Sequence, residues 1–82
     1  MARELRSAQE IQAEVSRLIH EGRGSRPGRD RVQVPLPVLR PVDGTGLNWS
    51  MSGFGNAIGF EKDIRSAVMA VGKRWNLAPP GA

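Results

Sequence analysis

The sequence predicts a small α+β domain whose elements follow in the order α-β-β-α. Two stretches repeat apolar residues at the 3.6-residue period of a helix, and between them two shorter stretches alternate apolar and polar residues as strands do. A chain of 82 residues suffices for one domain with a thin core, so we expect a single domain over 1–82. Because a two-stranded hairpin alone is marginally stable, both helices should pack on one face of an antiparallel β-hairpin.

The first predicted helix covers residues 7–21. Ser7 and Glu10 match the S-x-x-E capping box, and Gly22 stands where a glycine after a helix is favoured. Four apolar residues follow at helical spacing: Ile11, Val15, Leu18 and Ile19. The helix should therefore bury one face and expose the other.

Residues 22–31, with the sequence GRGSRPGRDR, contain no large apolar side chain and predict a flexible loop rich in Arg and Gly. Four arginines are candidate contacts to nucleic-acid phosphates: Arg23, Arg26, Arg29 and Arg31. Without an aromatic residue to stack on bases, such binding should be weak, non-specific and strongly salt-dependent. The alternative interpretation is a solvated loop that only adds charge.

The first predicted strand, VQVPLPV at 32–38, places four apolar residues on one side: Val32, Val34, Leu36 and Val38. Pro35 and Pro37 both lack a backbone N–H and are two positions apart, so the missing donors should fall on the same edge of the strand. We therefore predict an edge strand whose proline side faces outward.

The second predicted strand, 47–52, alternates an apolar side of Leu47, Trp49 and Met51 with a small polar side. It contains no proline, so its free edge should be able to pair with a second copy of the chain. The connecting residues leave open a short third strand around 38–42.

The second predicted helix runs over 60–76. It starts with Glu61 and Asp63 and ends with Lys73 and Arg74, as the helix dipole favours. Its apolar stripe consists of Phe60, Ile64, Ala67, Val68, Val71 and Trp75. Asn76 should take the left-handed position that ends the helix, and residues 77–82 should form a disordered tail.

The predicted core combines these stripes: Ile11, Val15, Leu18, Val32, Val34, Leu36, Leu47, Trp49, Met51, Ile64, Val68, Val71 and Trp75. The strand GLNWSMSGF, with its GxNW motif, and the amphipathic helix after it resemble short uncharacterised bacterial proteins of α-β-β-α order. This resemblance covers residues 46–76 and implies no function. The element order is also similar to that of the double-stranded RNA binding domain. That family has a lysine cluster at the start of its last helix, where this chain has Glu61, Lys62 and Asp63.

Gly53, Gly55 and Gly59 are spaced as in a phosphate-binding loop, but the helix after them starts with acidic residues that would repel phosphate. We therefore interpret these glycines as backbone turns. His20 is the only histidine and there is no cysteine, so no catalytic constellation, metal site or cofactor site is predicted. We expect a protein that is not an enzyme.

The net charge is +4, which favours acidic partners. The N-terminal residues lack the apolar segment of a signal peptide and no run is long enough to span a membrane, so we expect a cytoplasmic location. The favoured hypothesis is a protein-interaction or self-associating module, with a homodimer through the sheet edge or an unidentified protein partner. Its candidate interaction surface is the polar side of the sheet: Gln33, Asn48, Ser50 and Ser52. The alternative is a weak basic nucleic-acid-binding protein that uses the arginine loop.

Overall fold

The computed structural model describes residues 3–21 and 31–79 and shows a small α+β domain with two helices and short strands. The elements are β1 (Glu4–Arg6), α1 (Ala8–His20), β2 (Val38–Leu39), β3 (Trp49–Ser50), α2 (Glu61–Arg74) and β4 (Trp75–Leu77). Nine of the ten residues of the predicted arginine loop, and the last three residues of the predicted tail, lie outside the described residues.

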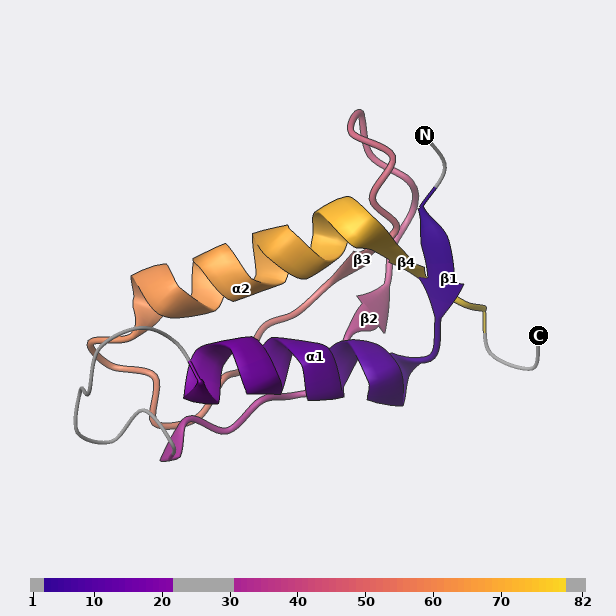
Figure 1. Ribbon diagram of the computed structural model, residues 1–82. Coiled ribbons are helices and arrows are strands. Elements are labelled where there is room, and N and C mark those ends of the chain that lie inside the picture. The colour runs from indigo at the N-terminus through magenta and orange to yellow at the C-terminus, as the bar shows by residue number, and fades with distance from the viewer. Residues whose placement is uncertain (1–2, 22–30, 80–82) are drawn as a thin grey trace.

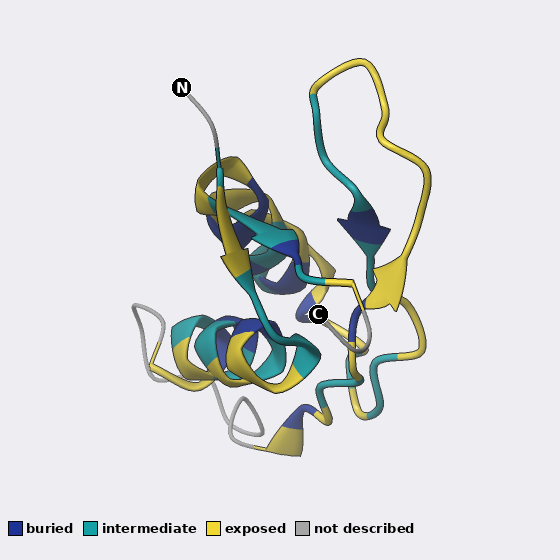
Figure 2. Cartoon of the chain, turned by 90° about the vertical axis from the view of Figure 1, so that its right-hand side faces the viewer, coloured by how far each residue is buried: buried dark blue, intermediate teal, exposed yellow. Residues whose placement is uncertain are grey.

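The two helices lie side by side and run in opposite directions (Figure 1). β1 leads into α1 and β4 continues from α2, so these two strands meet at one end of the helix pair. The β2–β3 hairpin forms the other side of the molecule, and the buried residues lie between it and the helices (Figure 2).

Helix α1 starts as its sequence predicts. The Ser7 side chain accepts a hydrogen bond from the Glu10 N–H at 3.1 Å, and the Glu10 carboxylate accepts one from the Ser7 N–H at 3.2 Å. This reciprocal capping satisfies two of the N–H groups that a helix start leaves unpaired. The bounds of the helix agree with the prediction to within one residue.

A parallel pairing between β1 and β4 was not predicted. Glu4 lies opposite Trp75 and Arg6 opposite Leu77, and the Ala78 N–H donates to the Arg6 carbonyl at 2.9 Å. Helix α2 therefore ends at Arg74, where Trp75 takes an extended conformation (φ −131°, ψ 144°). The prediction that the helix continues to Asn76 in a left-handed conformation is wrong, because pairing with β1 requires an extended chain there.

The hairpin is shorter and less regular than predicted. β2 pairs antiparallel with β3, so the short strand left open around 38–42 does form, at its first two residues. Of the predicted 32–38 strand, only Gln33 pairs before β2, in an isolated bridge to Gly55. Gln33 and Arg40 both donate their backbone N–H to the opposite limb although they are seven positions apart, an odd number, so the alternation reverses between them. Pro35 and Pro37, which lack N–H groups, lie in that stretch.

The reversal changes which residues face the core. Pro37 is buried, whereas Leu36 and Val38 are about half exposed, so the prediction that Leu36 belongs to the core is wrong. The buried apolar residues are Ile11, Val15, Ile19, Val32, Trp49, Phe60, Ile64, Ala67, Val71 and Leu77. The helices pack directly on each other and the hairpin inserts Trp49 beside them. The finer prediction that both helices lie on one face of a regular hairpin is not confirmed.

Candidate functional site

The candidate site is an apolar groove along the face of α2 that points away from α1. Ile64, Ala67 and Val71 turn toward the core, so Val68 and Met69 fall on another side of the helix. The chain after β3 runs beside this side and leaves a groove of about 370 Å³. Its lining residues are Met51, Phe54, Ala57, Glu61, Ile64, Arg65, Val68 and Met69.

A second hollow of about 220 Å³ lies nearer the end of α2, and Val68 and Met69 line both hollows. Its other lining residues are Arg3, Thr45, Leu47, Gly72 and Lys73. We call these two neighbouring hollows together the α2 groove. This groove follows the helix from its first turn to its last.

The hairpin is held close to the last turn of α2 by one arginine and one glycine. Arg3 donates from Nε to the Gly72 carbonyl at 2.6 Å and from Nη1 to the Thr45 carbonyl at 2.9 Å. Gly72 is buried, and a Cβ atom there would come within 3.2 Å of Leu47 Cδ1. Glycine at this position therefore allows the close approach of helix and hairpin.

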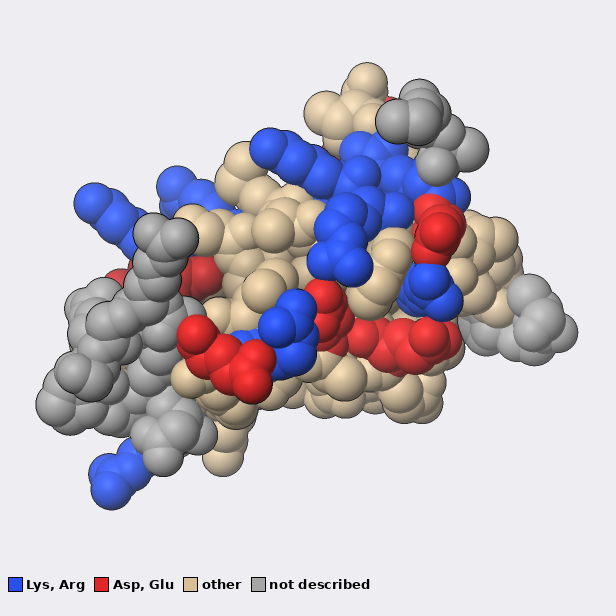
Figure 3. Space-filling view, in the orientation of Figure 1, with Lys and Arg blue, Asp and Glu red and all other residues tan. Residues whose placement is uncertain are grey.

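The floor of the α2 groove is apolar, and charged side chains lie at both ends. Met69 is 55% exposed, and Met51, Phe54 and Val68 are half-buried. Glu61 and Arg65 line the hollow at the start of α2, whereas Lys73 and Arg3 flank its last turn. In the space-filling view, Lys and Arg side chains gather over the C-terminal end of α2 and β1 (Figure 3).

The glycines before α2 do not leave its N-terminus free for a phosphate. Both carboxylate oxygens of Glu61 lie 3.0 Å from the Gly59 nitrogen and accept its N–H. Gly53 and Gly59 have φ angles of 85° and 89°, which favour glycine. The geometry thus agrees with the interpretation of these glycines as backbone turns.

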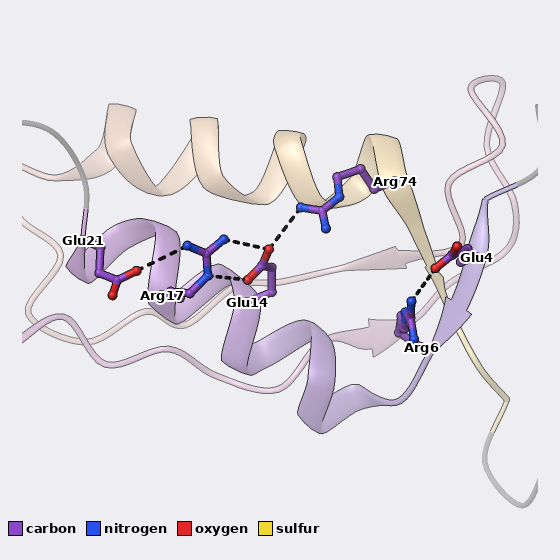
Figure 4. Close-up of polar contacts among 6 residues, drawn as sticks. All are labelled: Glu4, Arg6, Glu14, Arg17, Glu21 and Arg74. Carbon is purple, nitrogen blue, oxygen red and sulfur yellow. Dashed lines mark hydrogen bonds and ion pairs between the residues drawn. The ribbon is translucent and has the colours of Figure 1, made fainter.

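A second polar cluster joins the two helices (Figure 4). Glu14 of α1 accepts hydrogen bonds from Arg17 at 2.7 and 3.0 Å and from Arg74 of α2 at 3.0 Å. The hydrogen bonds from Arg17, followed by those from Arg74, lower the pKa of Glu14 from 4.5 to about 2. Arg74 also stacks on the Trp75 ring at 4.7 Å, and Arg6 lies 5.0 Å from the same ring. Glu14, Arg17 and Arg74 are engaged with one another, so we assign this cluster a structural role.

The candidate nucleic-acid contacts are mostly beyond the described part of the chain. Arg23, Arg26 and Arg29 lie outside it, and Arg31 is exposed beside the hairpin, where its carbonyl accepts a hydrogen bond from Asn56. The proposed contacts of these arginines stay a prediction.

The four residues predicted as an interaction surface are in unequal positions. Gln33 and Ser52 are exposed, and the Ser50 hydroxyl accepts a hydrogen bond from Arg40. The Asn48 amide is used inside the molecule, since it donates to the Leu77 carbonyl at 3.0 Å and accepts the Leu77 N–H at 2.8 Å. These four side chains therefore do not form one free polar face.

Residues 46–49 lie beside β4. Besides the two bonds of Asn48, the Trp49 indole N–H donates to the Trp75 carbonyl and the Asn76 amide donates to the Gly46 carbonyl, each at 3.0 Å. The start of the predicted second strand is thus covered by the chain itself. The homodimer expected through the edge of residues 47–52 stays a prediction.

The remaining candidates for chemistry are engaged locally. The ring nitrogens of His20 lie 3.0 Å from the Val32 carbonyl and 3.3 Å from the Ser16 hydroxyl. Asp43 accepts three hydrogen bonds in its own turn, two from Thr45 and one from Leu47, which lower its pKa. Over residues 3–21 and 31–79, no three acidic or histidine side chains come together as metal ligands.

Comparison with known proteins gave no match: no family model, no curated protein and no solved structure matches the chain. Neither helix in the described part of the chain has the length and apolar character needed to cross a membrane.

The sequence analysis missed the α2 groove because it placed Val68 and Met51 in the core. The sequence does hold a sign of the groove. A second set of residues on α2 recurs at helical spacing beside the buried stripe: Glu61, Arg65, Val68, Met69 and Gly72.

Proposed function

We propose that this protein is a non-enzymatic protein-interaction module that binds its partner in the α2 groove. The observation that carries the proposal is the pair of neighbouring apolar hollows along α2, with Met69 more than half exposed between them. An apolar surface of this kind, bordered by charged side chains, is typical of a site for another polypeptide.

The shape and composition of the groove support a helical partner. A helix of 14 residues is about 21 Å long, which is enough to present several turns to another helix. Met51 and Met69 are unbranched and can adapt to a bound apolar side chain. Amphipathic helices commonly bind in such grooves through residues at i, i+3, i+4 and i+7.

The proposal can be tested by affinity capture with three immobilised forms of the chain. Met69→Glu places a charge at the centre of the α2 groove, and Ala13→Glu places the same charge at an exposed position of α1. We expect proteins retained by the wild type and by Ala13→Glu to fall at least about tenfold with Met69→Glu, because a buried unpaired carboxylate opposes binding. Circular dichroism would establish that all three forms are folded. Equal retention by the three forms would contradict the proposal.

A further inference from the structure

We infer that this chain forms a homodimer through the outer edge of β1, where the β1 strands of two copies pair antiparallel with Leu5 opposite Leu5. β1 lies at one end of the helix pair, and most of it is exposed (Figure 2). The contact uses Glu4, Leu5 and Arg6, none of which lines the α2 groove. It is therefore a second interaction surface, and the inference does not rest on the proposed function.

The backbone of β1 presents unpaired polar groups on its outer edge. The Ala78 N–H donates to the Arg6 carbonyl, so the polar backbone groups of Arg6, and of Glu4 two positions before it, face β4. The N–H and carbonyl of Leu5 therefore point away from β4, and neither has a partner among the described residues. An edge of this kind is a template for pairing with another strand.

An antiparallel pairing centred on Leu5 satisfies both groups at once. Leu5 of each copy donates its N–H to the Leu5 carbonyl of the other, as a hydrogen-bonded pair of an antiparallel sheet does. The two Leu5 side chains, each 61% exposed in the single chain, then lie side by side on one face and lose contact with water. The pairing is its own copy about a twofold axis, so it closes as a dimer.

The charges on either side of Leu5 fit this register. Each Glu4 lies opposite Arg6 of the other copy, and opposite charges in directly facing positions stabilise a sheet. The side chains of Glu4 and Arg6 are 66% and 37% exposed, so a second chain can reach both. Within each chain they already form an ion pair, and dimerisation adds two further contacts of opposite sign. Glu10, 3.7 Å from Arg6, accepts the Ser7 N–H and stays with its own helix.

The other ways of pairing β1 with its copy are less favourable. A shift that sets Leu5 opposite Ser7 would need the Ser7 N–H and carbonyl, which are both bonded within the first turn of α1. A shift that sets Leu5 opposite Arg3 would place each Glu4 opposite its own copy, and like charges there are destabilising. A parallel pairing offsets the two strands by one residue, so it cannot be the same for both copies. The three residues of β1 therefore select one register.

The dimer joins two small sheets into one larger sheet. Each copy contributes β1 and β4, so the order becomes β4-β1-β1-β4 with the two β1 strands at the centre. A sheet of only two short strands is marginally stable, and further strands stabilise it. Because the new pairing contains only the two backbone hydrogen bonds of Leu5, we expect a weak dimer that forms at high concentration of the chain.

Sedimentation velocity over a dilution series up to about 1 mM tests the inference on the wild type, Leu5→Pro and Leu5→Val. Proline at this position removes the outward N–H and spares the pairing with β4, because that N–H points away from β4. Valine keeps the N–H and an apolar side chain. We expect the dimer dissociation constant to rise at least about tenfold in Leu5→Pro and to stay within about threefold of the wild type in Leu5→Val. A wild type that is monomeric at about 1 mM overturns the inference, and so does a dimer that Leu5→Pro leaves unchanged.

Charge reversal tests the register. In Glu4→Arg both charged residues of β1 are basic, and in Arg6→Glu both are acidic, so each variant alone should dimerise about tenfold more weakly than the wild type. An equimolar mixture of the two should recover a mixed dimer, because every facing pair is then of opposite sign. Glu21→Arg makes the same change of charge at the other end of α1 and should leave the dimer unchanged. A mixture as weak as either variant alone overturns the proposed register.

Arg6→Glu also removes a cation from the Trp75 ring, so the thermal midpoint of each variant is compared with that of the wild type. If Arg6→Glu or Leu5→Pro does not fold, Glu4→Arg decides the matter, since it must weaken the dimer. Met69→Glu should dimerise as the wild type does, because Met69 lies in the α2 groove and outside this contact. A dimer that Met69→Glu weakens and Glu4→Arg does not would lie on α2 and overturn the inference. The proposed function is judged separately, by the capture experiment.

Discussion

Helices α1 and α2 are joined mainly by apolar contacts, whereas β3 and β4 are joined by hydrogen bonds from side chains. Between the helices, Ile11, Val15 and Val71 are fully buried, and the Glu14 cluster closes one side. Between the strands, the side-chain amide of Asn48 takes the place of a neighbouring backbone. It donates to the Leu77 carbonyl and accepts the Leu77 N–H. Apolar contacts tolerate small shifts of the side chains that make them. The hydrogen bonds between the strands depend on a single side chain, Asn48, held in one position.

Trp49 belongs to both kinds of contact, and its removal should have the largest effect. It is 2% exposed in the core, and its indole N–H donates to the Trp75 carbonyl. Trp49→Ala should lower the free energy of unfolding by about 3 to 5 kcal/mol, as expected for a large buried aromatic residue. Urea unfolding followed by circular dichroism measures this change. An unaltered midpoint would remove Trp49 from the core.

Asn48 tests the hydrogen-bonded joint alone. Asn48→Ala leaves the N–H and carbonyl of the buried Leu77 without these partners and should cost about 2 to 3 kcal/mol. Asn48→Asp keeps the acceptor but not the donor, so it should also destabilise the fold. Ser52→Ala, at an exposed position of the same limb, is the matched control and should change stability by less than about 0.5 kcal/mol. Equal effects of Asn48→Ala and Ser52→Ala would show that the strands are held by other contacts.

The ion pairs of Glu14 between the two helices can be tested by the pH dependence of the free energy of unfolding. The pKa of Glu14 is about 2 in the folded chain against an ordinary value of 4.5, so its ionised form stabilises the fold above pH 4.5. This contribution should disappear as the pH falls from about 4.5 to 2. Unfolding of the wild type and of Glu14→Gln at several pH values should therefore show a stability difference that narrows toward pH 2. A difference that is constant with pH would contradict the assigned ion pairs.

The arginine loop between the helix α1 and the hairpin should give the smallest effect. If Arg23, Arg26, Arg29 and Arg31 contact phosphates, duplex DNA should bind with a dissociation constant of about 10⁻⁴ to 10⁻⁶ M at physiological salt. The logarithm of the affinity should fall with that of the salt concentration with a slope of about −3 to −4. Replacement of all four by Ser should remove most of this binding. Selective nanomolar binding that depends on these arginines would instead favour the nucleic-acid alternative.

The sequence predicted those parts of the fold that depend on neighbouring residues. Ser7 and Glu10 are three positions apart, and the first turn that they define forms as expected. The stripe of Ile11 and Val15 likewise needs only the period of a helix to be recognised. Helix α1 was therefore predicted almost to the residue.

The parts that were missed depend on residues distant in the sequence. Glu4, Leu5 and Arg6 are too few to mark a strand by their alternation, and Leu5 is 61% exposed, so only the pairing with β4 identifies them as one. Val68 fits the buried stripe of α2, and only the course of the chain after β3 decides that it lines a groove. Asn48 looks like a residue on the polar side of a strand, and only the position of Leu77 shows its role.

The contact of β1 with β4 has a consequence for how the chain folds during its synthesis. Arg3 and Gly72 are separated by 69 positions, and Glu4 pairs with Trp75, so this joint forms only after residue 77 has left the ribosome. Until then the apolar stripe of α1 has no α2 to cover it. Until residue 77 is available, this part of the nascent chain should therefore remain open to proteases and chaperones. It should then become compact in one step, whose rate is limited by the closure of a loop of 69 positions.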